Sequence, residues 1–450
     1  MKFVEFILKK SKFIAPIIII IALVHGFFGV HRWQYYPLYL LGVLYFVLIL
    51  LDYLDIFNLN SKTSKWIISI IILLIILSII SILGFQKQDL PTPSGEFQIG
   101  TKIFELEDKS RDEVYTEEEG DKRKIKYQAW YPTDEIETLQ KAKWITEGTL
   151  LTTNLGKNIL LTPRFILNHT AEIDSNSYYD AKLSRSLDKY PIVVISHGWK
   201  GFREIHTDFA EDLASNGFVV LSIDHTYGSQ AVKFNDGKVA YLKRSALPRL
   251  VKPSTFDKAA HELAVNFGKD VIMVLDEIER LNKEDETFME KLDLDKIGLL
   301  GHSTGGAGDV FTSLKDKRVK ALIGLDAWVN PLNIEDLKKG LDIPSLFLRS
   351  EQWTKRQSVE PLNVLVKNSD NANIIQLENT NHVDFTMVYM YSPLSKYVGF
   401  TGKEGGRESA KMQREITLKF FDENLRNNNN EDFLKEILEK YDNLKLKEIN

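Results

Sequence analysis

A strand, a tight glycine turn and a helix follow one another within residues 297–314, and this stretch most constrains the fold of the 450-residue chain. Residues 297–300 form a short apolar run, which is typical of a strand buried on both faces. Gly301-His-Ser-Thr-Gly305 fits the pattern G-x-S-x-G, and residues 307–314 can continue as a helix. A serine in such a turn takes a strained backbone conformation, so the hydroxyl of Ser303 should project above the sheet edge. The glycines are required because the strand and helix backbones pass too close for a side chain.

Strand and helix patterns alternate from Tyr190 onward, which indicates a parallel sheet with right-handed crossovers. Two earlier strands are expected at residues 97–106 and 124–131, with the charged segment 107–123 as an exposed connection. We therefore predict an α/β fold in which helices flank a mostly parallel sheet. The remaining strands are expected at residues 191–196, 218–224, 297–300, 319–325, 344–348 and 373–377, and the helices at 205–215, 256–281, 307–314 and 414–424.

Three apolar runs precede this region, at residues 13–30, 35–57 and 66–85. Each is near the roughly 20 residues that cross a hydrocarbon core as a helix. Aromatic residues such as Trp33 and Trp66 lie at the expected membrane interfaces. The first run resembles a signal peptide, but two further runs follow and no small-residue cleavage site is evident. The sequence therefore predicts three transmembrane helices, with the lipid bilayer as a partner.

The basic residues around these runs predict an orientation. Four lysines precede the first run, and Lys62 and Lys65 lie between the second and third, whereas the turn after the first run offers only Arg32. The positive-inside rule then places the N-terminus in the cytoplasm and everything after about Gln86 outside. We expect a multi-pass protein of the cell membrane with an extracytoplasmic domain.

Composition excludes several classes of function. The chain has no cysteine, which rules out disulfides, a cysteine nucleophile and thiolate metal sites. The formal net charge is −5 and no basic stripe with interleaved aromatic residues occurs, so no nucleic-acid partner is expected. No pattern calls for a metal or an organic cofactor.

A serine nucleophile needs a base, and the base needs an orienting carboxylate. His382 is the one histidine after Ser303, and it falls in a polar loop just past the last expected strand. Asp326 ends the strand after the serine turn and is the first candidate for the carboxylate. Its alternative role is purely structural, as the cap of a helix or turn. Glu351, at the end of the following strand, and Asp384, two residues after the histidine, are its rivals.

An oxyanion hole requires backbone N–H groups aimed at the developing negative charge. One is expected from Thr304, the residue after the nucleophile. The other is expected from Trp199, in the loop 197–201 after the strand 191–196. His197 and His302 are then packing residues and not bases. The segments 226–255 and 390–407 are candidates for shaping the acyl pocket, because loops at this sheet edge commonly do so.

Five separated motifs agree in order and spacing with one known family. They are Ser196-His-Gly198 with Phe202-Arg203, Leu213-Ala-Ser-Asn-Gly-Phe218, Gly301-His-Ser-Thr-Gly-Gly306, Leu325-Asp-Ala-Trp328 and His382-Val-Asp-Phe-Thr386. Over about residues 94–421 the chain resembles the platelet-activating factor acetylhydrolases of the plasma and type II intracellular kind. The resemblance implies an α/β-hydrolase fold and calcium-independent cleavage of short or oxidised acyl esters, such as the sn-2 ester of phospholipids.

Carried over to this chain, the resemblance implies Ser303 as nucleophile, Asp326 as acid and His382 as base, with the amides of Trp199 and Thr304 as the oxyanion hole. The three apolar runs and the segment 386–407 depart from the family and leave the substrate open. The expected division is a membrane region at 1–86, a linker at 87–96, a catalytic α/β-hydrolase domain at 97–426 and a charged helical tail at 427–450.

The sequence thus predicts a membrane-anchored serine ester hydrolase acting on short-chain or lipid-derived carboxylic esters. Two alternatives stay open: an acyltransferase that uses the same three residues, and a non-catalytic, membrane-tethered binding protein on a hydrolase scaffold.

Overall fold

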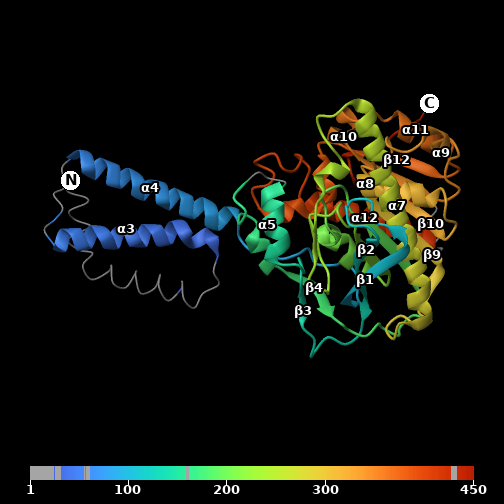
Figure 1. Cartoon of the computed structure of the whole chain (residues 1–450), viewed down its shortest axis with the longest axis horizontal. Coiled ribbons are helices and arrows are strands. Elements are labelled where there is room, and N and C mark those ends of the chain that lie inside the picture. The colour runs from blue at the N-terminus through green and yellow to red at the C-terminus, as the bar shows by residue number, and fades with distance from the viewer. Residues whose placement is uncertain are drawn as a thin grey trace.

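The structure is a computed structural model, and it describes residues 25, 32–54, 56, 61–158, 162–426 and 433–449. Two helices, α3 (Tyr36–Tyr53) and α4 (Ser61–Gly84), lie side by side and project from an α/β body that contains the rest of the described chain (Figure 1). Leu48 of α3 and Ile67 of α4 are buried against each other at their contact.

An eleven-stranded sheet forms the centre of the described α/β body. Its order is β13-β12-β11-β10-β9-β5-β6-β2-β1-β4-β3, and β7 (Ala231–Lys233) pairs with β8 (Val239–Tyr241) in a separate hairpin. The sheet strands are β1 (Gln98–Asp112), β2 (Lys122–Thr133), β3 (Lys141–Lys143), β4 (Asp174–Tyr179), β5 (Tyr190–Ser196), β6 (Val219–Asp224), β9 (Leu292–His302), β10 (Val319–Leu325), β11 (Ser345–Ser350), β12 (Ala372–Leu377) and β13 (Leu444–Leu446).

The six strands from β6 to β12 run parallel, and β2 pairs antiparallel with β6. Parallel strands are buried on both faces, which explains why their sequences are continuous apolar runs. Alternate residues of one strand enter different clusters, as Val194 packs on one face and Val193 on the other. The carboxyl ends of all six strands therefore meet at one edge.

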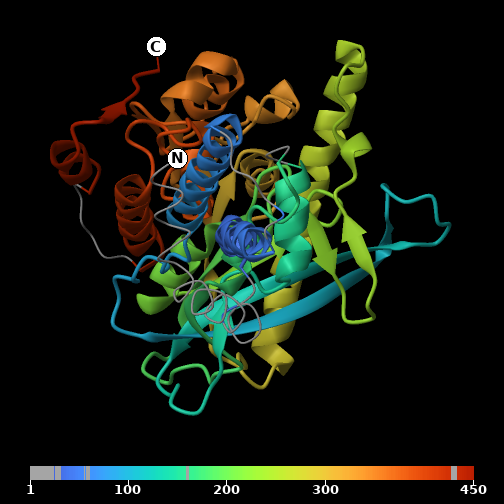
Figure 2. The same ribbon diagram turned by 90° about the vertical axis from the view of Figure 1, so that its left-hand side faces the viewer.

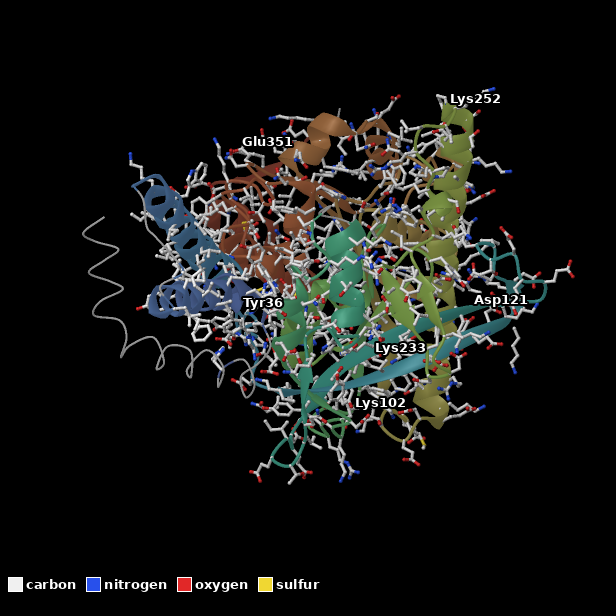
Figure 3. All side chains as sticks on the ribbon, turned by 60° about the vertical axis from the view of Figure 1, so that its left-hand side comes forward. Tyr36, Lys102, Asp121, Lys233, Lys252 and Glu351 are labelled. Carbon is white, nitrogen blue, oxygen red and sulfur yellow. The ribbon has the colours of Figure 1, made fainter. Side chains whose placement is uncertain are left out.

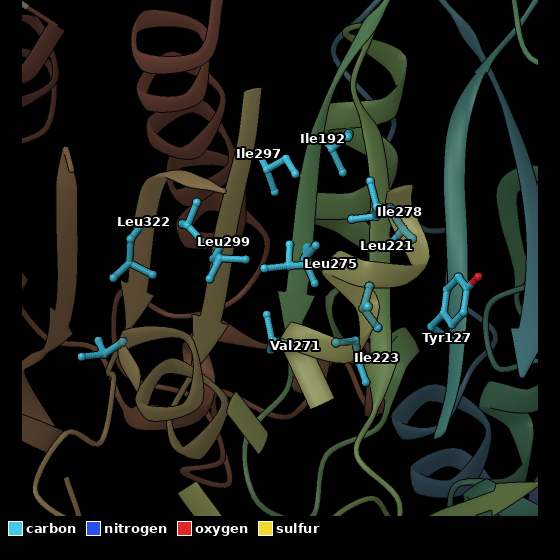
Figure 4. Packing of buried hydrophobic residues seen from close by; sticks show 14 of the residues in the cluster. Tyr127, Ile192, Leu221, Ile223, Val271, Leu275, Ile278, Ile297, Leu299 and Leu322 are labelled. Atoms are coloured by element: carbon cyan, nitrogen blue, oxygen red, sulfur yellow. The ribbon is translucent and has the colours of Figure 1, made fainter. Parts of the chain in front are cut away.

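Helices cover both faces of the sheet. Val271, Leu275 and Ile278 of α7 (Pro253–Glu284) pack against the central strands on one face, beside α8 (Thr304–Ser313) and α11 (Glu360–Lys367) (Figure 4). On the other face lie α6 (Thr207–Ser215), α12 (Arg407–Arg426) and α13 (Phe433–Lys440). Truncating a fully buried leucine such as Leu275 to alanine should cost about 2–5 kcal/mol of stability. The short helices are α5 (Thr149–Asn158), α9 (Ile334–Leu337) and α10 (Glu351–Arg356).

Two expectations about local structure are wrong. The charged segment 107–123 is not simply an exposed connection, because β1 continues to Asp112 and β2 begins at Lys122. Arg123 is buried there and binds the carboxylate of Asp270 with Nε and Nη2. The tail at 427–450 is not helical throughout, since α13 ends at Lys440 and β13 then pairs antiparallel with β12. A hydrophobic pattern does not reveal either feature, because both depend on partners far away in the sequence.

The structure does not support the prediction of three transmembrane helices. Among the described residues, one helical segment, Lys65–Gly84, is long and apolar enough to cross a bilayer. The second run forms α3, which has 18 residues, and the first run lies outside the described residues except for His25. Large apolar side chains of both helices are nevertheless exposed. The pair extends beyond the body in Figure 1, and Figure 2 views the molecule from the side on which it projects.

Candidate active site

Ser303 lies in the turn between β9 and α8 with φ 54° and ψ −118°, a conformation that is strained for a residue with a side chain. The flanking glycines permit this turn. A Cβ at Gly301 would lie 2.3 Å from the Asp309 carboxylate, and one at Gly305 would lie 2.4 Å from the Ser196 carbonyl oxygen. Neither position therefore accepts another residue, as the sequence predicts.

Backbone hydrogen bonds hold the end of β10 against this turn. The Ser303 N–H donates to the Leu325 carbonyl at 3.0 Å, and the Trp328 N–H donates to the Ser303 carbonyl at 2.9 Å. Asp326 lies between these two contacts, is fully buried, and has φ 43°. The structure therefore brings the nucleophile candidate and the carboxylate candidate to the same sheet edge.

His382 reaches Asp326 from the loop after β12. Its Nδ1 lies 3.0 Å from Asp326 Oδ2. The same carboxylate accepts hydrogen bonds from the N–H of Ser350, at 2.8 Å, and from the Ser350 hydroxyl. Three donors thus surround Asp326, which fixes the carboxylate and presents one oxygen to the imidazole. Hydrogen bonds of this kind orient the histidine in a Ser-His-Asp arrangement.

The two rival carboxylates point elsewhere. Glu351 begins α10 at the protein surface, where it binds Lys355 and the N–H of Asn379 (Figure 3). Asp384 accepts hydrogen bonds from the N–H groups of Asn381 and Gly402, and burial raises its pKa to about 6. Neither carboxylate hydrogen-bonds the His382 ring, so the geometry favours Asp326 of the three.

Aromatic rings enclose the imidazole of His382. The Trp353 ring stacks on it with centroids 3.8 Å apart and planes 11° apart, and the His302 ring lies 4.6 Å away. His302 Nε2 is also 3.1 Å from the His382 carbonyl oxygen. Burial holds the pKa of His302 well below its usual value, so this neighbour stays neutral and donates to the carbonyl. The described structure has no hydrogen bond between Ser303 and His382; such bonds are often long until substrate binds.

The loop 197–201 packs closely on the nucleophile turn. A Cβ at Gly198 would lie 2.9 Å from the Ser303 Cβ, so this loop is at van der Waals distance from the serine. Within the described chain, the amide N–H of Trp199 donates no hydrogen bond, nor does that of Thr304, the first residue of α8. Two unpaired N–H groups beside Ser303 are what an oxyanion hole requires.

His197, in the same loop, is a buried packing residue. Its Nε2 lies 2.7 Å from the Ser229 hydroxyl, and its Nδ1 lies 2.7 Å from the Gly198 carbonyl. Burial lowers its pKa to about 3. Because it is fully buried and already has hydrogen-bond partners, it is not available as a base. In the residues that the structure describes, no group of three His, Asp or Glu side chains is placed to hold a metal ion.

Two residues of the site were not found by sequence reasoning. Ser350 and Trp353 lie at the end of β11 and in α10, within the same stretch as the rejected candidate Glu351. A serine after a strand is a common helix cap, and Ser350 does cap α10 by accepting from the Trp353 N–H. No motif distinguishes this ordinary cap from one that also holds a functional carboxylate.

The two expected pocket segments lie in different places. The first runs beside the loop 197–201, since Leu247 shares a small apolar cluster with Trp199. The second meets the end of α4, where the Ser392 hydroxyl donates to the Gly84 carbonyl. In the described contacts, the first segment therefore reaches the loop that carries Trp199.

Comparison with known proteins decides the family. A family model described as "Platelet-activating factor acetylhydrolase, isoform II" matches residues 82–243 and 260–443. The chain belongs to this family. The match covers β1 to β12, with α8, and so includes Ser303, Asp326 and His382 as well as Trp199 and Thr304.

Curated relatives of the family carry esterase names. The chain is 28% identical over 222 residues to a "Platelet-activating factor acetylhydrolase" of Canis lupus familiaris, covering 45% of this chain and 49% of the relative. It is 25% identical over 264 residues to a "Probable 1-alkyl-2-acetylglycerophosphocholine esterase" of Arthroderma benhamiae, covering 54% of this chain and 60% of the relative. The chain thus spans about half the length of the curated relatives it matches.

A solved structure shows the same fold. The ferulic acid esterase from Streptomyces cinnamoneus superposes with a TM-score of 0.60 at 23% identity, covering 76% of this chain and 94% of that one. At this identity the likeness shows the fold alone. The mixed sheet flanked by helices therefore resembles an esterase of the α/β-hydrolase class, as the sequence predicts.

Proposed function

We propose that this protein is a serine ester hydrolase whose nucleophile is Ser303, whose base is His382 and whose orienting acid is Asp326. The observation that carries the proposal is the 3.0 Å contact between His382 Nδ1 and Asp326 Oδ2, beside a serine held in a strained turn. A carboxylate on Nδ1 leaves Nε2 of the same ring free to take a proton. Family membership supports the same reading.

The reaction proceeds through an acyl-enzyme. Ser303 Oγ attacks the ester carbonyl carbon while His382 Nε2 takes the hydroxyl proton, and Asp326 stabilises the resulting imidazolium. The amides of Trp199 and Thr304 donate to the negative oxygen of the tetrahedral intermediate. His382 then returns its proton to the leaving alkoxide, which departs as an alcohol. Water, deprotonated by His382, attacks the acyl-enzyme carbonyl, and His382 then returns that proton to Ser303 Oγ as the bond to serine breaks and the carboxylic acid leaves.

The substrate we assign is a short-chain or lipid-derived carboxylic ester, such as an sn-2 acyl ester of a glycerophospholipid. The names of the curated relatives support this class. The apolar pair α3 and α4, next to the α/β body, would keep the enzyme near lipid and favour such a substrate. No cofactor or metal takes part in the proposed steps.

Replacing the nucleophile tests the proposal. Ser303→Ala should abolish hydrolysis of p-nitrophenyl acetate and labelling by a fluorophosphonate probe, with little change in melting temperature. Ser358→Ala, at an exposed loop serine, is the matched control and should retain both ester hydrolysis and labelling by the probe. Undiminished turnover in Ser303→Ala would remove the nucleophile assignment. Acyl transfer to an added alcohol that outpaces hydrolysis would instead identify an acyltransferase.

The three apolar runs form a membrane anchor in this proposal, with the catalytic domain outside the cytoplasm. The support is the charge asymmetry around the runs and the exposed apolar surface of α3 and α4. Because the chain has no cysteine, one introduced at the exposed Glu119 would be the only thiol. A membrane-impermeant maleimide should label Glu119→Cys in intact cells. Labelling only after permeabilisation would show that the catalytic domain lies on the cytoplasmic side and would contradict the proposed orientation.

A further inference from the structure

Arg349 is a buried cation whose guanidinium is only partly used by the protein. Its side chain is 3% exposed and lies on the same sheet face as Phe347, because residues alternate between faces along β11. In the described chain, Nη1 donates to the Ala327 carbonyl at 3.3 Å, whereas Nε and Nη2 have no hydrogen-bond partner. Buried charged groups are normally paired, since idle donors are costly. Idle N–H groups on a buried cation indicate a partner outside the chain.

Asp326 does not satisfy this guanidinium. It forms the one ion pair of Arg349 in the described structure, with Nε 3.9 Å from Oδ1. That distance is longer than the roughly 2.7–3.2 Å of an N–H···O hydrogen bond. Both Asp326 oxygens already accept hydrogen bonds, Oδ1 from the Ser350 N–H and Oδ2 from the Ser350 hydroxyl and the His382 ring. Arg349 is therefore attracted to Asp326 without being bound by it.

A pocket of about 230 Å³ lies beside Arg349. It is formed where β11, β12, α10 and α11 come together near the C-terminal end of the chain (Figure 1). Its wall is largely apolar and carries two side-chain amides. The residues that form this wall include Leu362, Asn363, Ile374, Gln376 and Ile449. The volume is below the roughly 300–1,000 Å³ of pockets for drug-sized ligands, so the pocket suits a small molecule.

The charged side chains of this pocket favour one negative charge. Arg349 and Lys447 contribute two positive charges and Glu448 one negative charge, so the net charge of the lining is +1. The Lys447 N–H donates to the Ile374 carbonyl at 2.9 Å, which fixes this part of the tail to β12. A guanidinium takes both oxygens of a carboxylate with paired N–H donors, and the apolar wall suits a short hydrocarbon chain. A doubly charged phosphate fits the net charge and the apolar wall less well.

We propose that Arg349 and Lys447 bind the carboxylate of a short-chain carboxylic acid, at a site separate from the catalytic serine. Neither Ser303 nor His382 belongs to the lining of this pocket in the described chain. The inference goes beyond the proposed function, because binding at Arg349 requires no reaction at Ser303. The occupant would share the guanidinium with Asp326, which lies 3.9 Å from Nε on the protein side.

Calorimetric titration with butyrate tests the site. The full-length Ser303→Ala protein in neutral detergent should bind butyrate saturably. Butyramide, which has nearly the same shape without the charge, should not bind, and inorganic phosphate should bind at least about tenfold more weakly. The measurement needs no turnover, so it stands whether or not the parent protein is an esterase. Equal affinity for butyrate and butyramide, or for butyrate and phosphate, would overturn the inference.

Variants of the two cations locate the binding. Arg349→Met, added to Ser303→Ala, should abolish butyrate binding. Its melting temperature without butyrate should match or exceed that of the parent, because it removes a buried charge with idle donors. Lys447→Gln should weaken binding about tenfold, the loss of one charged hydrogen bond. Lys445→Gln, at an exposed lysine of β13 outside the pocket, is the matched control.

Two results would contradict the assignment. Undiminished butyrate binding in folded Arg349→Met would place the carboxylate elsewhere, for example at the oxyanion hole. If Arg349→Met does not fold, Lys447→Gln decides, since Lys447 is exposed and its loss leaves the core unchanged. Equal butyrate affinity in Lys447→Gln and Lys445→Gln would then overturn the inference.

Discussion

Two histidines of this protein have nearly the same immediate surroundings. His382 has Nδ1 3.0 Å from Asp326 and stacks on Trp353 with centroids 3.8 Å apart. His225 has Nδ1 3.1 Å from Asp270 and stacks on Phe267 with centroids 3.9 Å apart. A search for a histidine with a buried carboxylate and an aromatic face would return both pairs.

The difference lies in what else reaches each pair. Asp270 binds the guanidinium of Arg123 with both oxygens and is also 3.1 Å from Arg111, and His225 is fully buried. The His382 side chain is 19% exposed and belongs to the sheet edge that carries Ser303. An oriented imidazole is therefore not sufficient for catalysis. Access to a nucleophile and to substrate separates a reactive pair from a structural one.

Removing each imidazole gives the largest expected contrast. His382→Gln should lower turnover of p-nitrophenyl acetate by about 10⁶, because the loss of the base disables the whole triad. His225→Gln should leave the turnover of the folded protein near the wild-type value and lower its melting temperature. A comparable loss of turnover in both variants, measured on folded protein, would show that the two pairs are not functionally distinct.

The two aspartates extend the contrast to stability. Asp326→Asn should reduce turnover by about 10³–10⁴. Asp270→Asn should instead cost about 3–5 kcal/mol in the free energy of unfolding, because buried Arg123 loses one of the two carboxylates that it binds, the other being Glu113. Urea unfolding and ester turnover of both variants measure this. If Glu351→Gln abolished turnover and Asp326→Asn did not, the choice of acid would be wrong.

The stacking ring at His382 should have a smaller effect. Trp353→Leu removes the aromatic face and should lower kcat about tenfold with little change in KM, since such ring pairs are worth about 0.5–1.5 kcal/mol. Trp353→Phe keeps a face and should restore most of kcat. A rise in KM with kcat unchanged would make Trp353 a substrate-binding residue and not one that positions His382.

The smallest effect concerns pH. Burial lowers the pKa of His225 below its usual value, so the folded state holds this ring neutral while the unfolded state protonates it. The stability contributed by the neutral ring is complete above about pH 6.5 and is lost as pH falls toward the folded-state pKa. Below about pH 6.5 the free energy of unfolding of the wild-type protein should therefore fall with decreasing pH. In His225→Gln that fall should be smaller, by up to about 1.4 kcal/mol per pH unit. An identical slope in both proteins would contradict the assignment.

The sequence predicted the parts of this comparison that local patterns encode. The predicted strand 319–325 agrees with β10 at both ends, because an apolar run bounded by charged residues marks where a buried strand begins and ends. The order of residues along the chain selected His382, the one histidine after Ser303, and the structure places its ring beside Asp326. The His225 pair was not predicted, since Asp270 sits on the buried face of α7 and Arg123 within a segment that looked exposed. Trp353 and Ser350 were missed because a stacking ring and a second donor require positions in space, not spacing in sequence.

The most direct test is to map where a fluorophosphonate attaches. The full-length protein is labelled, digested and analysed by mass spectrometry, with Asp326→Asn and Asp270→Asn alongside. The account predicts one adduct on the peptide that contains Ser303, formed slowly in Asp326→Asn and at the normal rate in folded Asp270→Asn. An adduct on another residue, or ester hydrolysis that continues with Ser303 unmodified, would contradict it.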